Sequence, residues 1–162
     1  MSIRIGQGFD VHQLEPEIPL IIGGVYIPFD KGSKGHSDGD VLYHTLTDAI
    51  LGALALGDIG QHFPYNDDRW QNADSSQFLA HSFRLIQDKG YEVANIDSTI
   101  VLQSPQVGSY IQAMKENIAG ILGINIDQVS VKATTTDKLG FTGRREGIAA
   151  SAVVLLKKAD GS

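Results

Sequence analysis

The segment 148–157 is the part of the chain that most restricts its fold. Its centre, from Ala152 to Leu156, is continuously apolar, and such a run predicts a strand that is covered on both faces. Apolar residues at helical spacing predict three helices, at about 41–56, 75–89 and 107–122. Three helices do not suffice to cover both faces of a sheet, so we expect a partner subunit to cover part of one face.

The remaining strands are predicted from alternating and β-branched segments. They are expected at 3–10, 93–102 and 129–135, with a β-hairpin of 20–22 and 25–27 around Gly23-Gly24. The glycine-rich segment 30–39 is expected to be a mobile loop. The order strand, hairpin, helix, helix, strand, helix, strand, strand indicates one α+β domain over residues 1–162.

Composition narrows the classes of function. The chain has 162 residues, 42% of them hydrophobic and 20% charged, which is typical of a soluble globular protein. The net charge of -6, without a Lys/Arg-rich run, disfavours nucleic acid as a partner. No cysteine is present, which excludes disulfides and thiolate-bound zinc. Neither a secretory leader nor an apolar run of about 18 residues is found, so no membrane association and a cytoplasmic location are expected.

Two segments carry residues that suit a metal ion. Asp10 and His12 are two positions apart, so an extended backbone directs both side chains to the same face. His44 lies in the first turns of the helix expected from about residue 41. Three nitrogen or oxygen ligands with a fourth position left open are typical of catalytic zinc. The alternative is an exposed His12 and a His44 that is hydrogen-bonded inside the core.

The stretch 36–40 precedes this helix and suits a phosphate. A polar, glycine-containing helix start offers free backbone N–H groups, and His36 could donate to a phosphoryl oxygen. In the alternative reading, Asp38 and Asp40 cap the helix and His36 is a solvated loop residue. Asp48, one turn after His44, could support that histidine or act as a cap.

A second group of phosphate-compatible residues follows the strand expected at 129–135. The hydroxyls at 134–136 suit phosphate oxygens, and Asp137 suits magnesium. Arg144 and its neighbour at 145 are good phosphate partners. Against this, threonine is common in strands, and an arginine could pair with Glu146 at the surface. No P-loop, dinucleotide fingerprint or Ser/His/Asp arrangement is present.

Taken together and in order, these blocks resemble the 2-C-methyl-D-erythritol 2,4-cyclodiphosphate synthase family of the non-mevalonate isoprenoid pathway. Each block alone is weak, but the combination is highly specific and spans nearly the whole chain. The matching stretches are 4–12 (RIGQGFDVH), 21–24 (IIGG), 36–41 (HSDGDV), 46–49 (LTDA), 55–60 (ALGDIG), 132–136 (KATTT) and 140–144 (GFTGR).

The resemblance implies a fold and a reaction. The subunit would be a ferredoxin-like α+β domain with a four-stranded mixed sheet, three helices and an extra β-hairpin. It would assemble as a homotrimer with active sites between adjacent subunits. The 2-phosphate of 4-diphosphocytidyl-2-C-methyl-D-erythritol 2-phosphate would attack the β-phosphorus, CMP would leave, and the cyclic diphosphate would form. The enzyme would thus be a phosphorus-oxygen lyase.

The resemblance also implies roles for particular residues. Asp10, His12 and His44 would hold zinc, and a magnesium or manganese ion would bind near Asp137. His36 and Thr135 would stabilise the pentacoordinate phosphorus. The positions that would contact substrate are Ser37, Asp58, Ile59, Gly60, Phe63 and Asp67 on the phosphate and methylerythritol side, and Leu102, Ser104, Pro105, Thr134 and Asp137 on the cytidine-phosphate side. Phe141 and Arg144 match positions that face the centre of the trimer, where family members hold isoprenoid diphosphates.

Three departures from the family pattern and two rival functions remain. Asp137 stands where glutamate is usual, Tyr65-Asn66 replaces Asp-Thr after Pro64, and Gln106 stands where lysine is common. One rival is a metal-dependent phosphohydrolase with a zinc-bound water as nucleophile. The other is a non-catalytic trimeric module that binds isoprenoid diphosphates.

Overall fold

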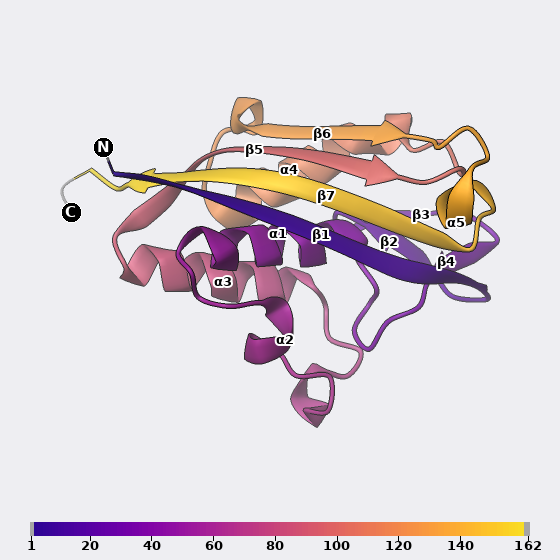
Figure 1. Ribbon diagram of the computed structural model, residues 1–162, viewed down its shortest axis with the longest axis horizontal. Helices are drawn as coiled ribbons and strands as arrows, with labels where there is room; N and C mark the ends of the chain where they lie inside the picture. The colour runs from indigo at the N-terminus through magenta and orange to yellow at the C-terminus, as the bar shows by residue number, and fades with distance from the viewer. Residues whose placement is uncertain (1, 161–162) are drawn as a thin grey trace.

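The computed structural model describes residues 2–160 and contains two sheets (Figure 1). The larger sheet has the strand order β4-β1-β7-β5-β6, in which β5 and β6 are parallel and the other neighbours are antiparallel. The smaller sheet is the predicted hairpin of β2 and β3. The strands are β1 (Ile3–Pro16), β2 (Leu20–Ile22), β3 (Val25–Ile27), β4 (Lys31–Ser33), β5 (Tyr91–Val101), β6 (Val129–Thr134) and β7 (Gly147–Lys158).

Three helices of 12 or 13 residues confirm the three predicted from periodicity. They are α1 (Val41–Ala53), α3 (Ser76–Asp88) and α4 (Ile111–Leu122). Two short helices, α2 (Ile59–His62) and α5 (Gly140–Gly143), and 3-10 turns at Asp68–Trp70, Gly108–Tyr110 and Ile126–Gln128 complete the chain. No helix within residues 2–160 combines the length and apolarity needed to cross a membrane.

The larger sheet buries one face and leaves the other open. Ile96, Ser98 and Ile100 of β5 point into the core beneath the helices, as the alternation predicted. Within residues 2–160, α5 covers the opposite face only near Gly147 at the start of β7, and Val153 at the centre of β7 is 43% exposed. On the neighbouring strand β1, the exposed apolar residues are Ile3, Ile5, Phe9 and Val11. The described chain therefore leaves one face of its last strand open from its centre onward.

The prediction of a four-stranded sheet is wrong by one strand. The 30–39 segment is not simply a mobile loop, because β4 pairs with the end of β1, which continues to Pro16 rather than ending near residue 10. This pairing uses backbone groups alone, so the sequence Lys-Gly-Ser carries no alternation to reveal it. Gly32 permits the pairing, because a Cβ there would lie 2.1 Å from the carbonyl oxygen of Ile18.

Helix α1 runs against β1 at very short range. A Cβ at Gly6 would lie 1.9 Å from the carbonyl oxygen of Ala49, and one at Gly8 would lie 2.1 Å from that of Thr45. Helix α1 and strand β1 therefore run in opposite directions, so residues later in β1 lie beside earlier residues of α1. Alternate strand residues share a face. Asp10 and His12, which follow Gly6 and Gly8 on this face, therefore lie beside the first turns of α1.

Asp40 fixes where α1 begins. Its side chain accepts a hydrogen bond from the Tyr43 N–H at 3.1 Å, as an N-cap does. The same carboxylate accepts from the N–H groups of Gly23 and Gly24 at 2.9 and 2.7 Å. Asp40 thus ties the β2–β3 hairpin to the helix start, which confirms its predicted capping role.

Candidate active site

The predicted metal ligands meet where β1 passes the first turns of α1. Asp10 Oδ2 lies 2.8 Å from His12 Nε2 and 3.4 Å from His44 Nδ1, and the two ring nitrogens are 3.0 Å apart. Within residues 2–160 this is the only group of three or more His, Asp or Glu side chains close enough to share one ion. His44 is also buried and hydrogen-bonded to Ser75, as the alternative reading expected, but it lies beside Asp10 and His12.

The chemistry of the three groups fits a divalent metal. His12 Nδ1 lies 2.9 Å from the carbonyl oxygen of Lys34, which can only accept, so this nitrogen carries the ring proton. The neutral ring then presents the lone pair of Nε2 to the cluster. Asp10 Oδ2 is buried and has no hydrogen-bond partner in the described chain. Buried acceptors that face one another without a donor are unfavourable, and a cation would satisfy them.

The same neighbours shift the ionisation of the cluster. Burial alone would raise the pKa of Asp10, but the adjacent His12 and His44 outweigh burial and hold the pKa well below its ordinary range. Burial would lower the pKa of His12, but Asp10 outweighs it and the pKa is raised. A proton on His12 is therefore a strong competitor for any metal ion.

A cavity of about 380 Å³ opens beside the triad. It is lined by His12, His36, Ser37, His44, Ile59, Gly60, Phe63, Pro64, Tyr65, Asn66, Trp70 and Phe78. Of these, Trp70 and Phe78 were not predicted as site residues. Trp70 meets Phe63 edge-on at 5.0 Å between ring centroids, and Phe63 packs on Phe78 at 4.5 Å. A single tryptophan inside a polar loop was the available signal for this wall.

His36 lines this cavity and has a ring nitrogen without a protein partner. Its Nε2 is buried and lacks a hydrogen-bond partner among residues 2–160. The loop that carries it is held by backbone bonds from Asn72 N to His36 O at 2.8 Å and from Asp38 N to Ala73 O at 3.2 Å. The loop that carries the ring is therefore held by the main chain, and Nε2 has no partner among residues 2–160.

Carboxylates near the cavity shape its backbone. Asp58 caps α2 by accepting from Gln61 N at 2.9 Å, and Asp67 accepts from Arg69 N at 3.0 Å while pairing with its guanidinium. Asp48 accepts from Ile59 N at 2.7 Å, which confirms its reading as a capping partner. Neither Asp58 nor Asp67 lines the cavity, and their contacts with substrate stay predictions.

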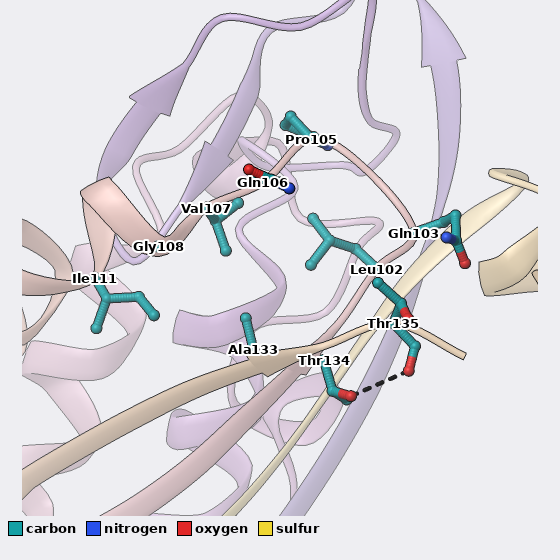
Figure 2. A pocket seen from close by; sticks show the side chains of 10 residues that line it. All are labelled: Leu102, Gln103, Pro105, Gln106, Val107, Gly108, Ile111, Ala133, Thr134 and Thr135. Carbon is teal, nitrogen blue, oxygen red and sulfur yellow. Dashed lines mark hydrogen bonds between the residues drawn. The ribbon is translucent and has the colours of Figure 1, made fainter. Parts of the chain in front are cut away.

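A second cavity, of about 360 Å³, lies at the ends of β5 and β6 (Figure 2). The two strands are parallel, so the loop after β5 and the residues after β6 meet there. Figure 2 shows the 102–108 loop passing over Thr134 and Thr135. The lining residues are Leu102, Gln103, Pro105, Gln106, Val107, Gly108, Ile111, Ala133, Thr134 and Thr135. The predicted cytidine-side residues Leu102, Pro105 and Thr134 are thus brought together, whereas Ser104 is not among the lining residues.

The hydroxyl of Thr135 keeps a proton to donate. Its Oγ1 accepts a hydrogen bond from Asp137 N at 3.2 Å, whereas Thr134 Oγ1 donates to the Thr135 carbonyl oxygen at 3.1 Å. Asp137 has a positive φ of 53° and stands outside the triad. Because the two cavities share no lining residue, His36 and Thr135 lie in separate cavities of one chain.

Phe141 and Arg144 lie on α5 and just after it. Phe141 is 40% exposed and borders a further cavity of about 400 Å³ together with Val11 and Lys31. The Arg144 side chain pairs with that of Glu146 at an exposed position. The surface ion pair considered from the sequence is therefore present.

The comparisons with known proteins agree with this geometry. Residues 3–157 match the model of the YgbB family. The chain belongs to the YgbB family. A relative from Bacillus pumilus named 2-C-methyl-D-erythritol 2,4-cyclodiphosphate synthase is 60% identical over 156 residues, which cover 96% of this chain and 99% of the relative. One of the same name from a Geobacillus species is 59% identical over 155 residues, covering 96% and 98%.

Solved structures of YgbB relatives share the fold. The bifunctional IspDF from Campylobacter jejuni matches with a TM-score of 0.94 and 47% identity, covering 98% of this chain and 43% of that longer one. IspF from Plasmodium falciparum, in a complex with CDP, matches with a TM-score of 0.87 and 38% identity, covering 98% of each chain. The predictions of an α+β fold, of this synthase family and of an enzyme of the lyase class are confirmed.

Proposed function

We propose that this YgbB protein converts 4-diphosphocytidyl-2-C-methyl-D-erythritol 2-phosphate to 2-C-methyl-D-erythritol 2,4-cyclodiphosphate and CMP. The observation that carries the proposal is the Asp10, His12 and His44 cluster beside a cavity into which His36 brings an unpartnered ring nitrogen. Support also comes from three relatives that carry the name of this synthase. They are 57–60% identical to this chain, and the match covers 98–99% of each relative.

The two ends of the substrate are assigned to the two cavities. The cytidine phosphate occupies the cavity of the 102–108 loop and Thr134, a proposal supported by the CDP complex of the Plasmodium falciparum relative. The methylerythritol end occupies the cavity bordered by Ile59, Gly60 and Phe63. Backbone N–H and C=O groups of the first loop would read the base, and the aromatic wall of the second excludes water.

The reaction needs no nucleophile from the protein. An oxygen of the substrate's 2-phosphate forms a bond to the β-phosphorus, the bond from that phosphorus to the CMP oxygen breaks, and its electron pair leaves with CMP. His36 and Thr135 donate to the oxygens that gain charge as the phosphorus becomes pentacoordinate. A divalent cation held by Asp10, His12 and His44 would supply charge neutralisation at the phosphates and orient them.

The metals are proposed as zinc at the triad and magnesium or manganese near Asp137. Two nitrogens and one oxygen, with one position open, suit catalytic zinc. Magnesium usually binds through one or two carboxylates plus substrate phosphates, so a lone Asp137 beside Thr135 fits the second ion. Because aspartate is one methylene shorter than glutamate, a water molecule can bridge Asp137 to that ion.

A homotrimer would place His36 of one subunit near Thr135 of its neighbour. His36 and Thr135 act on the same phosphorus in the proposed reaction, yet they lie in separate cavities of one chain. An active site between adjacent subunits brings one residue from each copy. The open apolar face of β1 and β7 would supply the subunit contact. Phe141 and Arg144 would then face the central region and bind an isoprenoid diphosphate, in an enzyme located in the cytoplasm.

Product analysis separates the proposed cyclase from its rivals. The protein is incubated with the cytidyl substrate, zinc and magnesium, and the products are followed by phosphorus NMR. The cyclase releases CMP together with a cyclic diphosphate, whereas a phosphohydrolase releases inorganic phosphate and a binding module releases nothing. His36→Ala should abolish CMP release, while Gln87→Ala, at an exposed position near the end of α3, should retain it. Absence of CMP under every metal condition would falsify the assignment.

A further inference from the structure

Behind the triad, His44 is connected to a buried serine and an aspartate. His44 Nε2, the ring nitrogen that points away from the cluster, lies 2.8 Å from Ser75 Oγ. Ser75 is completely buried, and its hydroxyl donates to Asp38 Oδ1. The chain Asp38–Ser75–His44 thus runs from a carboxylate to the metal-facing ring through a single hydroxyl.

Ser75 does not serve the role that its position suggests. It precedes the first residue of α3, a position at which serine commonly caps a helix. Its side chain, however, makes no capping hydrogen bond, and Asp38 Oδ2 instead accepts from the Ser75 N–H at 2.9 Å. The hydroxyl of Ser75 is therefore committed to Asp38 and His44 rather than to the helix.

The direction of the hydrogen bonds follows from counting protons. A carboxylate only accepts, and a serine hydroxyl has one proton to give. Because Ser75 gives its proton to Asp38, its oxygen can only accept from His44, so the proton of the neutral ring must sit on Nε2. His44 Nδ1 is then left with a lone pair directed at Asp10 and His12.

We propose that Asp38 and Ser75 are positioning residues that hold His44 as its Nε2–H tautomer and so present Nδ1 to the metal. The inference rests on the proposed role of the triad as a metal site. Carboxylates that orient metal-binding histidines from behind are a general device of such sites. Here the carboxylate acts through a serine, because Asp38 lies on the loop before α1 and Ser75 on the loop before α3.

The arrangement also determines what Ser37 can do. Ser37 Oγ lies 3.0 Å from His44 Nε2 and 3.3 Å from Ser75 Oγ, and it borders the site cavity. Since His44 is a donor toward both hydroxyls, Ser37 does not give its proton to the ring. Because Ser75 gives its own proton to Asp38, the Ser37 proton can go to Ser75 Oγ or to a ligand in the cavity, such as a phosphate.

The Asp38→Ala variant tests the direction of this chain. It removes the acceptor of the Ser75 hydroxyl, so this buried hydroxyl would turn and donate to His44 Nε2. The ring proton would then move to Nδ1, inside the metal cluster. We expect a change of the His44 tautomer, read from ring nitrogen shifts in metal-free protein near pH 8, and a loss of zinc affinity on the order of 10- to 100-fold.

Matched variants control for charge and folding. Asp74→Asn removes a nearby carboxylate that accepts only from the Ser76 N–H, and Ser76→Ala removes the hydroxyl next to Ser75. Both should keep the wild-type tautomer and zinc affinity. Ser75→Ala removes the acceptor and should give mixed tautomers and weaker zinc binding even if the Asp38 variant does not fold.

The outcomes separate this inference from the proposed function. A wild-type His44 in the Nε2–H form, in a protein that releases no CMP, would leave the positioning chain standing and overturn the cyclase. A wild-type His44 in the Nδ1–H form would overturn the positioning chain, whatever the activity. So would an Asp38→Ala protein that keeps the wild-type tautomer and a zinc affinity within about twofold, a change of less than 1 kcal/mol.

Discussion

The carbonyl oxygen of Thr45 occupies the space that a side chain at Gly8 would need, 2.1 Å from the position of its Cβ. This contact sets the distance between β1 and α1. Since His44 precedes Thr45 and Asp10 follows Gly8 on the same face of the strand, the contact also sets the spacing of the proposed metal ligands.

Gly8→Ala should therefore loosen both the fold and the site. The added methyl meets backbone rather than a movable side chain, so the helix must shift, at a cost of about 1–3 kcal/mol in the free energy of unfolding. Zinc affinity should fall as well. Urea unfolding at fixed protein concentration and zinc titration measure the two effects.

Gly120→Ala is the matched control for this substitution. A Cβ at Gly120 in α4 would meet nothing within 4 Å, so the helix should gain about 0.8–1 kcal/mol from the better helix former. Equal effects of the two substitutions would contradict the close approach of α1 to β1.

Acidification should release the triad's metal. Ligation needs neutral His12 and His44, and Asp10 raises the pKa of His12 above its ordinary value of about 6.5. Asp10 therefore stabilises protonated His12 fully below pH 6.5, and this stabilisation is lost as the pH rises through the raised pKa of His12. As the pH falls through that raised pKa, protons bind His12 and displace the metal. Zinc content after dialysis at steps from pH 8 to 4 measures the release. Constant zinc content down to about pH 4 would rule out the histidine ligands.

Placing a charge on the open sheet face should disperse the proposed trimer. Phe9 is 59% exposed in the single chain, so Phe9→Asp should do little to the subunit but should lower the mass measured by light scattering. CMP release should fall with the mass. Tyr26→Asp, at a residue 62% exposed on the β2–β3 hairpin, is the control and should keep the oligomeric mass.

Mixing two inactive proteins tests whether sites form between subunits. His36→Ala and Thr135→Ala should each abolish CMP release. After denaturation and refolding together in equal amounts, random assembly gives about one quarter of the sites an intact His36 from one copy and an intact Thr135 from its neighbour. Recovery of about that share of wild-type activity is expected. A mixture that stays inactive would indicate that both residues must come from one chain.

Local patterns in the sequence were sufficient to predict the three longer helices. The spacing of apolar residues predicted α1, α3 and α4, because a helix must bury one stripe of its surface. The end of α1 was predicted too late, near residue 56. The helix ends at Ala53, where the chain turns through a positive φ at Ala55 to begin α2. The turn leads to Ile59 and Gly60, which line the site cavity. It does not change the spacing of apolar residues, so the hydrophobic pattern could not predict it.

The sequence by itself determined that Asp10 and His12 share one face of a strand and that His44 lies early in a helix, because both facts follow from backbone geometry. Only the tertiary structure decided that the three meet, because their meeting depends on the close approach of α1 to β1. It alone revealed β4, whose pairing uses main-chain groups common to all residues. It also assigned the Ser75 hydroxyl to His44, since a hydrogen bond between side chains 31 positions apart depends on how two loops pack.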